Sequence, residues 1–230
     1  MFLCNTAKFG SRFLLRVSIE HANAAMIVLK ARRARSLPLT IVQAGEEVLR
    51  AQARALTAKE IRSRQTQRLI EDMRETMRAA PGVGLAAPQV GVPLQLVVIE
   101  DREEYHVKAT PEQLAERGRR PVPFHVLINP RIISTTDPGL EFFEGCLSVA
   151  GYTAIVPRFR RVVVEFLNER AEPVRVEAEG WYARILQHEI DHLNGILYID
   201  RMQSRTFGNL ENYEKLWKGA AAGAVHKKLG

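Results

Sequence analysis

Cysteine is scarce in this sequence, and long apolar runs are missing. Cys4 and Cys146 are the only cysteines among 230 residues, so no disulfide framework is predicted and a reducing compartment is favoured. No apolar stretch approaches the roughly 20 residues that a membrane-spanning helix needs, so we expect no membrane partner. Hydrophobic residues make up 46% of the chain and charged residues 26%, which is typical of a globular domain with its own core.

Acidic residues are almost missing from the first 36 positions. Seven lysines and arginines against Glu20 alone give this segment +6 of the net charge of +7, so the rest of the chain is close to neutral. A protein that binds nucleic acid needs its positive charge on the folded domain. The sequence therefore predicts no specific nucleic-acid partner.

Three interpretations of the basic segment 1–36 stay open. It is arginine-rich and poor in acids, as organellar transit peptides are. A second interpretation is a disordered extension. A third is that translation starts at Met26, so that residues 1–25 are never made. The segment has few of the serines that a transit peptide would carry, which favours the last two interpretations. We expect a cytoplasmic protein, with an organelle as the alternative if the segment is a transit peptide.

Beyond this segment, short β-rich runs alternate with helical patterns. Apolar residues recur at three- and four-residue steps from Ser63 to Ala80, which predicts an amphipathic helix. A short surface helix is expected at Thr110, within a charged segment, 101–123, that is interpreted as a solvated face. The connections between the β-rich runs are too short for parallel crossovers, so antiparallel pairing is expected. The expected strands are 94–100, 124–128, 131–135, 152–156, 161–167 and 174–178, with Asn129–Pro130 separating the second from the third.

The sequence QHEIDH at 187–192 is an H-E-x-x-H motif in a predicted helix, 181–194. His188 and His192 are four residues apart, so one helical face carries both imidazoles and can bind one divalent metal. Glu189 lies beside the first imidazole, where it can exchange protons with water at the metal. The helix is apolar on most of its sides, which predicts that it is buried and that its histidines face a pocket. An isolated motif of this length also occurs by chance on surface helices.

A catalytic site of this type needs a third protein ligand. The downstream candidates Glu211, Glu214 and His226 are present, but no known ligand pattern accompanies them. The other candidate is Cys146, which lies in a Gly-flanked turn beside strands. Taken alone, such a cysteine is more often a small buried hydrophobe than a ligand.

Three stretches together resemble the signature motifs of peptide deformylases. They are GVGLAAPQ at 82–89, EGCLS at 144–148 and QHEIDH at 187–192, and they occur in the order typical of that family. The resemblance covers about residues 38–208, and no motif position departs from the pattern. The charged segment 101–123 is longer than in the shortest members, and the basic segment 1–36 lies outside the family core.

The resemblance implies a metal held by Cys146, His188 and His192, with water or hydroxide at a fourth position. The hydroxide would attack the formyl carbon at a peptide N-terminus, with Glu189 as the general base that then returns the proton to the leaving amine. Cysteine binds as a thiolate, which the metal itself promotes. This set of donors suits iron(II), zinc, cobalt or nickel. The family resemblance implies Fe(2+) as the usual native metal.

The resemblance and the chain position also indicate residues that contact the substrate. The Gln89 side-chain amide and the Leu147 backbone N–H would stabilise the oxyanion of the tetrahedral intermediate. Gly82 and Gly84 let the backbone approach a substrate that pairs with this stretch like an added strand. The expected substrate-binding residues are Val83, Gly84, Gly145, Trp181 and Ile185, and the pocket for the methionine side chain is assigned to Val83, Trp181 and Ile185.

Three polar residues are candidates for orienting the metal ligands, because ligating histidines usually donate their second N–H to a carboxylate or carbonyl. These residues are Asp191, Gln187 and Glu144. For Asp191 and Gln187, the alternative is a solvent-facing polar side chain. For Glu144, the alternative is an ion pair with an arginine such as Arg184.

The sequence thus predicts an α+β fold in which antiparallel sheets enclose a central metal-binding helix. Residues 1–36 form the N-terminal extension, 37–208 the deformylase catalytic domain, and 209–230 a C-terminal helix with a frayed tail. The implied reaction releases formate from the formyl-methionyl end of nascent polypeptides. A solvated end is preferred over a transient ribosome contact for Lys227 and Lys228.

Two other functions compete with deformylation. A metal-dependent endopeptidase would cut internal peptide bonds. The sequence lacks the downstream ligand motif of such enzymes, and this function would leave Cys146 without a role. A non-catalytic binding module could keep the fold, but every position that the chemistry requires is present.

Overall fold

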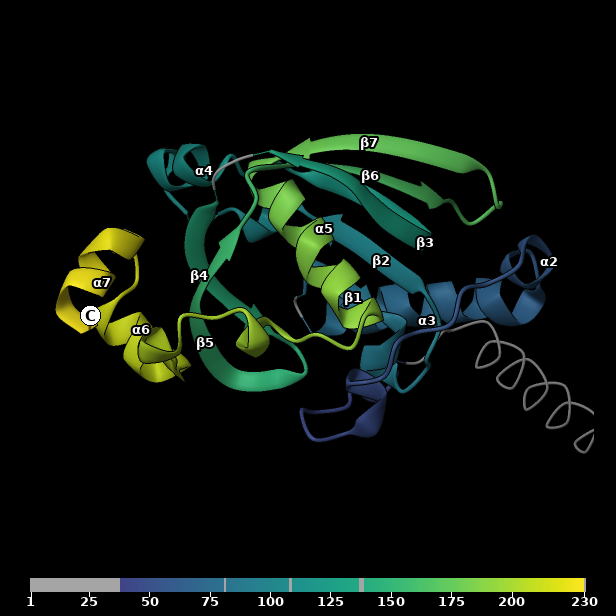
Figure 1. The fold of residues 1–230 in the computed structure, drawn as a ribbon, viewed down its shortest axis with the longest axis horizontal. Helices are drawn as coiled ribbons and strands as arrows, with labels where there is room; N and C mark the ends of the chain where they lie inside the picture. The colour runs from purple at the N-terminus through teal and green to yellow at the C-terminus, as the bar shows by residue number, and fades with distance from the viewer. Residues whose placement is uncertain (1–37, 81, 108, 137–138, 230) are drawn as a thin grey trace, which may run out of the picture. The chain divides into compact units, whose positions relative to one another are not determined.

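The structure, a computed structural model, describes residues 38–80, 82–107, 109–136 and 139–229 (Figure 1). The basic segment 1–36 and the three interpretations of it lie outside these residues. The helices that the described residues form are α2 (Ala58–Ile61), α3 (Arg64–Ala79), α4 (Pro111–Arg117), α5 (Gly180–Leu193), α6 (Leu210–Leu216) and α7 (Ala222–Leu229). None of the described helices has the length and apolar character needed to cross a membrane.

The larger sheet is antiparallel and has the strand order β1-β2-β3-β6-β7. Its strands are β1 (Gly84–Ala86), β2 (Leu96–Asp101), β3 (Val122–Thr136), β6 (Arg161–Leu167) and β7 (Pro173–Glu179). The expected break at Asn129–Pro130 is wrong, because β3 continues through it as a bulge between Ile128 and Arg131. Asn129 adopts a positive φ of 52°, and its side chain bonds both backbone groups of Leu56, which holds the bulge in place.

The smaller sheet is also antiparallel, with β4 (Leu140–Cys146), β5 (Val149–Arg158) and the short β8 (Gly208–Asn209) in that order. The sequence did not predict β4, because its residues LEFFEGC carry no β-branched side chain and little alternation. Cys146 therefore ends a strand rather than lying in a free turn. The tight hairpin pairs Cys146 with Val149.

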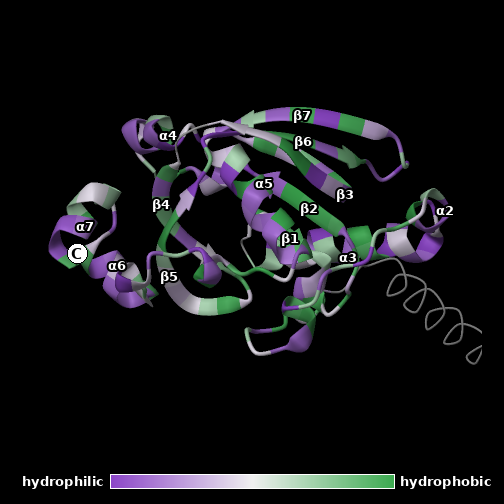
Figure 2. Cartoon of the chain, viewed as in Figure 1, coloured by the Kyte–Doolittle hydropathy of each residue, from purple (hydrophilic) through white to green (hydrophobic). Residues whose placement is uncertain are grey.

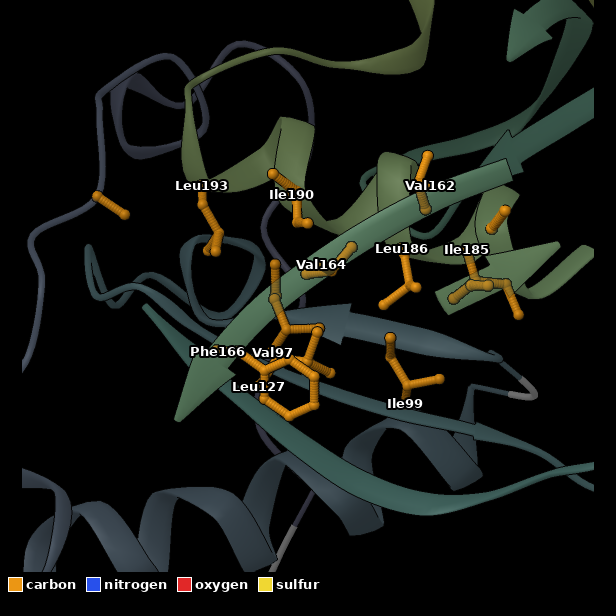
Figure 3. Packing of buried hydrophobic residues seen from close by; sticks show 14 residues of the cluster. Val97, Ile99, Leu127, Val162, Val164, Phe166, Ile185, Leu186, Ile190 and Leu193 are labelled. Carbon is orange, nitrogen blue, oxygen red and sulfur yellow. The ribbon is translucent and has the colours of Figure 1, made fainter. Parts of the chain in front are cut away.

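Helix α5 lies between the two sheets (Figure 1). Its apolar face packs on the larger sheet, and Figure 3 shows Leu186 and Ile190 directed at that sheet's buried side chains, among them Val97. Alternate residues of β2 face the opposite side, where α3 covers the sheet through Met73 and Met77. Figure 2 shows most of β2 as apolar, as expected for a strand covered on both faces. The α+β prediction is confirmed, and a buried helix stands at its centre.

Two expectations about charged or polar segments are wrong. The 101–123 segment is not simply a solvated face, since Asp101 is fully buried and accepts two hydrogen bonds of 2.8 Å from Arg119. The Gly/Ala/Lys-rich end is not frayed up to residue 229, since it forms α7 and buries Val225. A bond from Arg205 to the carbonyl of Leu229 fastens this helix. The small helix at Pro111 forms as predicted, with the Thr110 capping box.

Candidate metal centre

Three potential metal ligands meet where the end of β4 approaches α5. Cys146 comes from β4, and His188 and His192 come from successive turns of α5. The ligand atoms of these residues all lie within 4.8 Å of one another. The Cys146 Sγ is 3.3 Å from the His192 Nε2.

The spacing and chemistry of these donors fit one metal ion. A tetrahedral ion with bonds of about 2.3 Å to sulfur and about 2.0–2.1 Å to nitrogen separates those two donors by roughly 3.6 Å. The separation of 3.3 Å between Cys146 Sγ and His192 Nε2 is close to that value. The His188 Nδ1 is bonded to a carboxylate oxygen of Glu144 at 3.0 Å, which is the second contact typical of a ligating histidine. These three residues would hold the metal.

Glu144 connects the candidate ligands to a buried cluster of arginines. Arg158 donates two hydrogen bonds of 3.0 Å to its carboxylate, and Arg184 donates one of 2.5 Å. Burial alone would raise the pKa of Glu144, but the bonds from His188 and Arg158 hold it below its ordinary value. Both roles considered for Glu144 are therefore present, because it contacts His188 and also pairs with Arg184.

The other two candidates for orienting the ligands contact different groups. Asp191 has no hydrogen bond to a histidine among the described residues; it pairs with Arg158 at 2.5 Å and with Arg201 at 2.6 Å. Gln187 is buried, so it is not solvent-facing, and it exchanges hydrogen bonds of 3.0 and 2.9 Å with the backbone of Phe159. Arg158 was missed in the sequence, because nothing in a β-rich run marks an arginine as buried.

Arg158→Met is expected to lower the free energy of unfolding by about 3–5 kcal/mol, because it leaves the Glu144 and Asp191 carboxylates buried without their shared partner. Urea unfolding of the metal-free protein measures this change. Arg175→Met is the matched control, since Arg175 is 58% exposed in its pair with Glu165 and exposed pairs contribute about 0–1 kcal/mol. Equal stability of the two variants would contradict the assigned role of Arg158.

Glu189 is buried beside the ligands, and one of its oxygens has no hydrogen-bond partner within the described residues. Burial raises the pKa of Glu189 to about 7. A carboxyl group with this pKa can both accept and donate a proton near neutral pH. Gly84 lies directly against the carboxylate, because a Cβ at Gly84 would be 2.6 Å from the Glu189 Cδ.

Gly84→Ala is expected to displace the Glu189 carboxylate, because the added methyl group meets it far inside van der Waals contact. Overpacking of this kind costs about 1–3 kcal/mol, so the free energy of unfolding should fall by about that amount in urea unfolding. Gly208→Ala is the control, since a Cβ there meets nothing within 4 Å. A Gly84→Ala protein as stable as this control would refute the close contact.

Of the two candidate oxyanion donors, Gln89 approaches the ligand group from another element, and Leu147 follows Cys146 in the chain. The buried Gln89 directs its Nε2 at the Cys146 Sγ, 3.5 Å away, and at the Ser148 Oγ, 3.3 Å away. Its Oε1 accepts a bond of 2.9 Å from the Ala86 N–H, which fixes the orientation of the amide. Gln43, which the sequence analysis did not single out, donates to the Leu147 carbonyl at 3.0 Å.

One cavity of about 450 Å³ joins these residues. Nearly all the residues proposed from sequence line it, namely Val83, Gly84, Gln89, Gly145, Cys146, Leu147, Trp181, Ile185, His188 and Glu189. His192 lies behind them and is almost fully buried. The cavity is also lined by Phe143, Tyr152 and Leu210, which sequence patterns did not indicate.

A family model described as polypeptide deformylase matches residues 38–207. The chain belongs to the polypeptide deformylase family. Cys146, His188, His192, Glu189 and Gln89 all lie inside the matched range.

Individual family members resemble the chain over most of its length. Peptide deformylase 1A, chloroplastic, of Solanum lycopersicum is 46% identical over 174 residues, which cover 76% of this chain and 63% of that protein. Peptide deformylase, mitochondrial, of Homo sapiens is 42% identical over 170 residues, which cover 74% of this chain and 70% of that protein. The chain thus spans slightly less than two thirds of the tomato relative.

Solved deformylase structures share the fold. A class I type b peptide deformylase from Acinetobacter baumannii, described as bound to Met-Ala-Ser, has a TM-score of 0.66 and 33% identity, covering 73% of this chain and all of that one. A peptide deformylase from Synechococcus elongatus in complex with actinonin has a TM-score of 0.61 and 38% identity, covering 83% of this chain and 91% of that one.

Proposed function

We propose that this deformylase family member removes the formyl group from the formyl-methionine at the N-terminus of new polypeptides and releases formate. The observation that carries the proposal is that three metal donors meet beside one cavity, which a buried carboxyl group and an oriented amide also line. The names of the relatives and the Met-Ala-Ser bound to the Acinetobacter baumannii protein support the same substrate class.

Each polar group has a role in amide hydrolysis. Cys146, His188 and His192 would hold a metal, which would supply the Lewis acidity that amide hydrolysis needs. Glu189 accepts a proton from the attacking water and delivers it to the nitrogen of the methionine as the C–N bond breaks, so that formate and a free amine leave.

The oxyanion that forms during the attack needs hydrogen-bond donors that are already in place. The Gln89 Nε2 and the Leu147 N–H are proposed for this role. Gln89 is held by the Ala86 N–H, and the loop at Leu147 is held by the Gln43 side chain, so neither donor group has to reorganise much during the reaction. Val83, Gly84, Gly145, Trp181 and Ile185 are proposed to contact the substrate.

The thiolate and two imidazoles favour a borderline or soft divalent metal. We propose Fe(2+) as the native ion, with Zn(2+), Co(2+) or Ni(2+) as substitutes in the same site. Metal analysis of protein purified without oxygen, together with activity after replacement of each metal, tests this order. Full activity with zinc alone and none with iron would contradict it.

The proposed partners are nascent formyl-methionyl chains, with ribosome contact through Lys227 and Lys228 kept as a weaker prediction. The compartment depends on residues 1–36. Relatives named chloroplastic or mitochondrial support an organelle, whereas an untranslated segment before Met26 supports the cytoplasm. N-terminal sequencing of the native protein distinguishes these cases from a retained extension.

An endopeptidase role is disfavoured by the donors themselves. His226 is 3.0 Å from Glu141 and is not part of the ligand group found among the described residues. The third donor is Cys146, so no downstream ligand is needed. Internal peptide bonds should therefore remain intact when the formyl group is removed.

Formate release from formyl-Met-Ala-Ser, with protein purified without oxygen, tests the proposal directly. Release of formate and Met-Ala-Ser, with no smaller fragments, is the expected result. A fully metallated wild-type protein that releases no formate would overturn the proposal and favour a binding module. Cleavage between Met and Ala would favour a peptidase.

A further inference from the structure

Guanidinium groups and aromatic rings alternate in a stack that runs from the end of α4 to the candidate metal centre. The Arg119 guanidinium carbon is 5.1 Å from the centre of the Trp181 ring, and that of Arg117 is 5.5 Å from the same ring. Arg117 is also 5.4 Å from the Phe142 ring, which Arg184 approaches to 5.2 Å. We call these five residues the arginine–aromatic stack.

Buried carboxylates fix both ends of the arginine–aromatic stack. At one end, Arg119 is bonded through two nitrogens to Asp101, which is fully buried and also lies 3.1 Å from the His106 Nε2. At the other end, Arg184 is bonded to Glu144. A bidentate pair with a planar guanidinium restrains its orientation, so the first arginine can hold a ring in place.

The backbone brings α4 directly onto the first residue of α5. A Cβ at Gly180 would be 2.8 Å from the carbonyl oxygen of Arg117, and Gly180 has a φ of +64°. Only glycine suits both conditions. Figure 1 shows α4 beside the start of α5 and the adjoining end of β4. Trp181 follows at once, so α4 lies over the part of α5 that carries the ring.

Trp181 lines the same cavity as Cys146 and Glu189, whereas Arg117 and Arg119 do not line it. The indole N–H of Trp181 is buried and has no hydrogen-bond partner among the described residues, so no such bond selects the ring's orientation. Stacking against two guanidinium groups is therefore a main restraint on this wall of the cavity, together with apolar packing.

We propose that Arg117 and Arg119 are positioning residues that hold Trp181 as a wall of the substrate pocket. The segment between β2 and β3 thereby sets how tightly the methionine side chain is bound. This inference rests on the proposed function for its substrate, but the restraint on Trp181 is a property of the protein alone.

The test uses a Trp217→Phe background, because Trp181 and Trp217 are the two tryptophans of the chain. In that background, Arg117→Met removes one guanidinium without unpairing a carboxylate, since the described residues give its side chain no ion pair. Arg119→Lys keeps the charge beside Asp101 but loses the planar contact. Arg120→Met is the control, because Arg120 is exposed and outside the stack.

Acrylamide quenching of Trp181 should increase about twofold in Arg117→Met and Arg119→Lys, but not in Arg120→Met. The KM for formyl-Met-Ala-Ser should rise about five- to tenfold in the first two variants, with kcat within about twofold of the background. This range matches the cation–π energies known in proteins.

Unchanged quenching in both stack variants would overturn the proposal, as would increased quenching with an unchanged KM. Equal losses of kcat, metal content and thermal stability would also overturn it, because they indicate a purely structural role. Failure of the proposed function is distinguishable, since it is an absence of formate release in the Trp217→Phe background itself, while the quenching measurement needs no substrate.

Discussion

Glu189→Gln is expected to lower kcat/KM for formate release by about a thousandfold, within the range of general acid–base catalysis. The amide has nearly the volume of the carboxyl group, so the cavity keeps its shape, but it cannot accept a proton from water. Metal content should stay at the wild-type level, because Glu189 is not among the three donors. Formate release and metal analysis on the same preparation measure both effects.

Stability should change in the opposite direction to activity. Burial raises the pKa of Glu189 from its ordinary 4.5 to about 7, so an ionised carboxylate disfavours the folded chain. This cost develops as the pH rises above about 4.5 and is complete above about pH 7. At pH 8, the free energy of unfolding of metal-free Glu189→Gln should therefore be at least as high as that of the metal-free wild type.

The matched control for this prediction is Glu211→Gln. Glu211 is exposed on α6, so the same chemical change should leave activity and stability unaltered. A kcat/KM of Glu189→Gln within about tenfold of the wild-type value would contradict the proposed acid–base role. Loss of metal from Glu189→Gln would instead point to a broader disturbance of the site.

The parts of the site that lie within one helix were predictable from the sequence. His188 and His192 share a face because of the helical period, and Leu186 and Ile190 face the sheet for the same reason. Gly195, with a φ of +72°, follows the end of this helix in the left-handed conformation that glycine adopts readily.

The parts that depend on pairing between distant strands were not predictable from local patterns. Cys146 is 46 residues from His192, and only the resemblance to a family brought them together. Arg158 and Asp191 are 33 residues apart, and no periodicity marks the arginine as buried. The arginine–aromatic stack was not predictable for a related reason. A charged segment such as 101–123 is usually solvated, and the rings that its arginines contact lie on α5 and β4.

Cysteine is the donor on which the proposed ligand set depends most. Of the three proposed donors, Cys146 alone would bind a metal as an anion, while His188 and His192 would bind as neutral imidazoles. It is also the donor that separates a deformylase from a peptidase with a downstream histidine or glutamate ligand. The sharpest test of the metal centre is therefore the removal of the Cys146 thiol.

Cys146→Ala is expected to reduce the metal content from about one ion per chain to below about one tenth after dialysis against a competing chelator, because two imidazoles alone bind weakly. Formate release should fall with it by at least about a thousandfold. The truncation removes only one partly buried sulfur, so the metal-free wild type and variant should differ in unfolding free energy by no more than about 1–2 kcal/mol. Metal binding stabilises the fold that holds it, so added metal should raise the unfolding temperature of the wild type and not of the variant.

His226→Ala is the control, because His226 contacts Glu141 outside the donor group and this substitution should leave metal content unchanged. Stoichiometric metal in Cys146→Ala would mean that another residue completes the site, and the assignment of Cys146 would have to be abandoned.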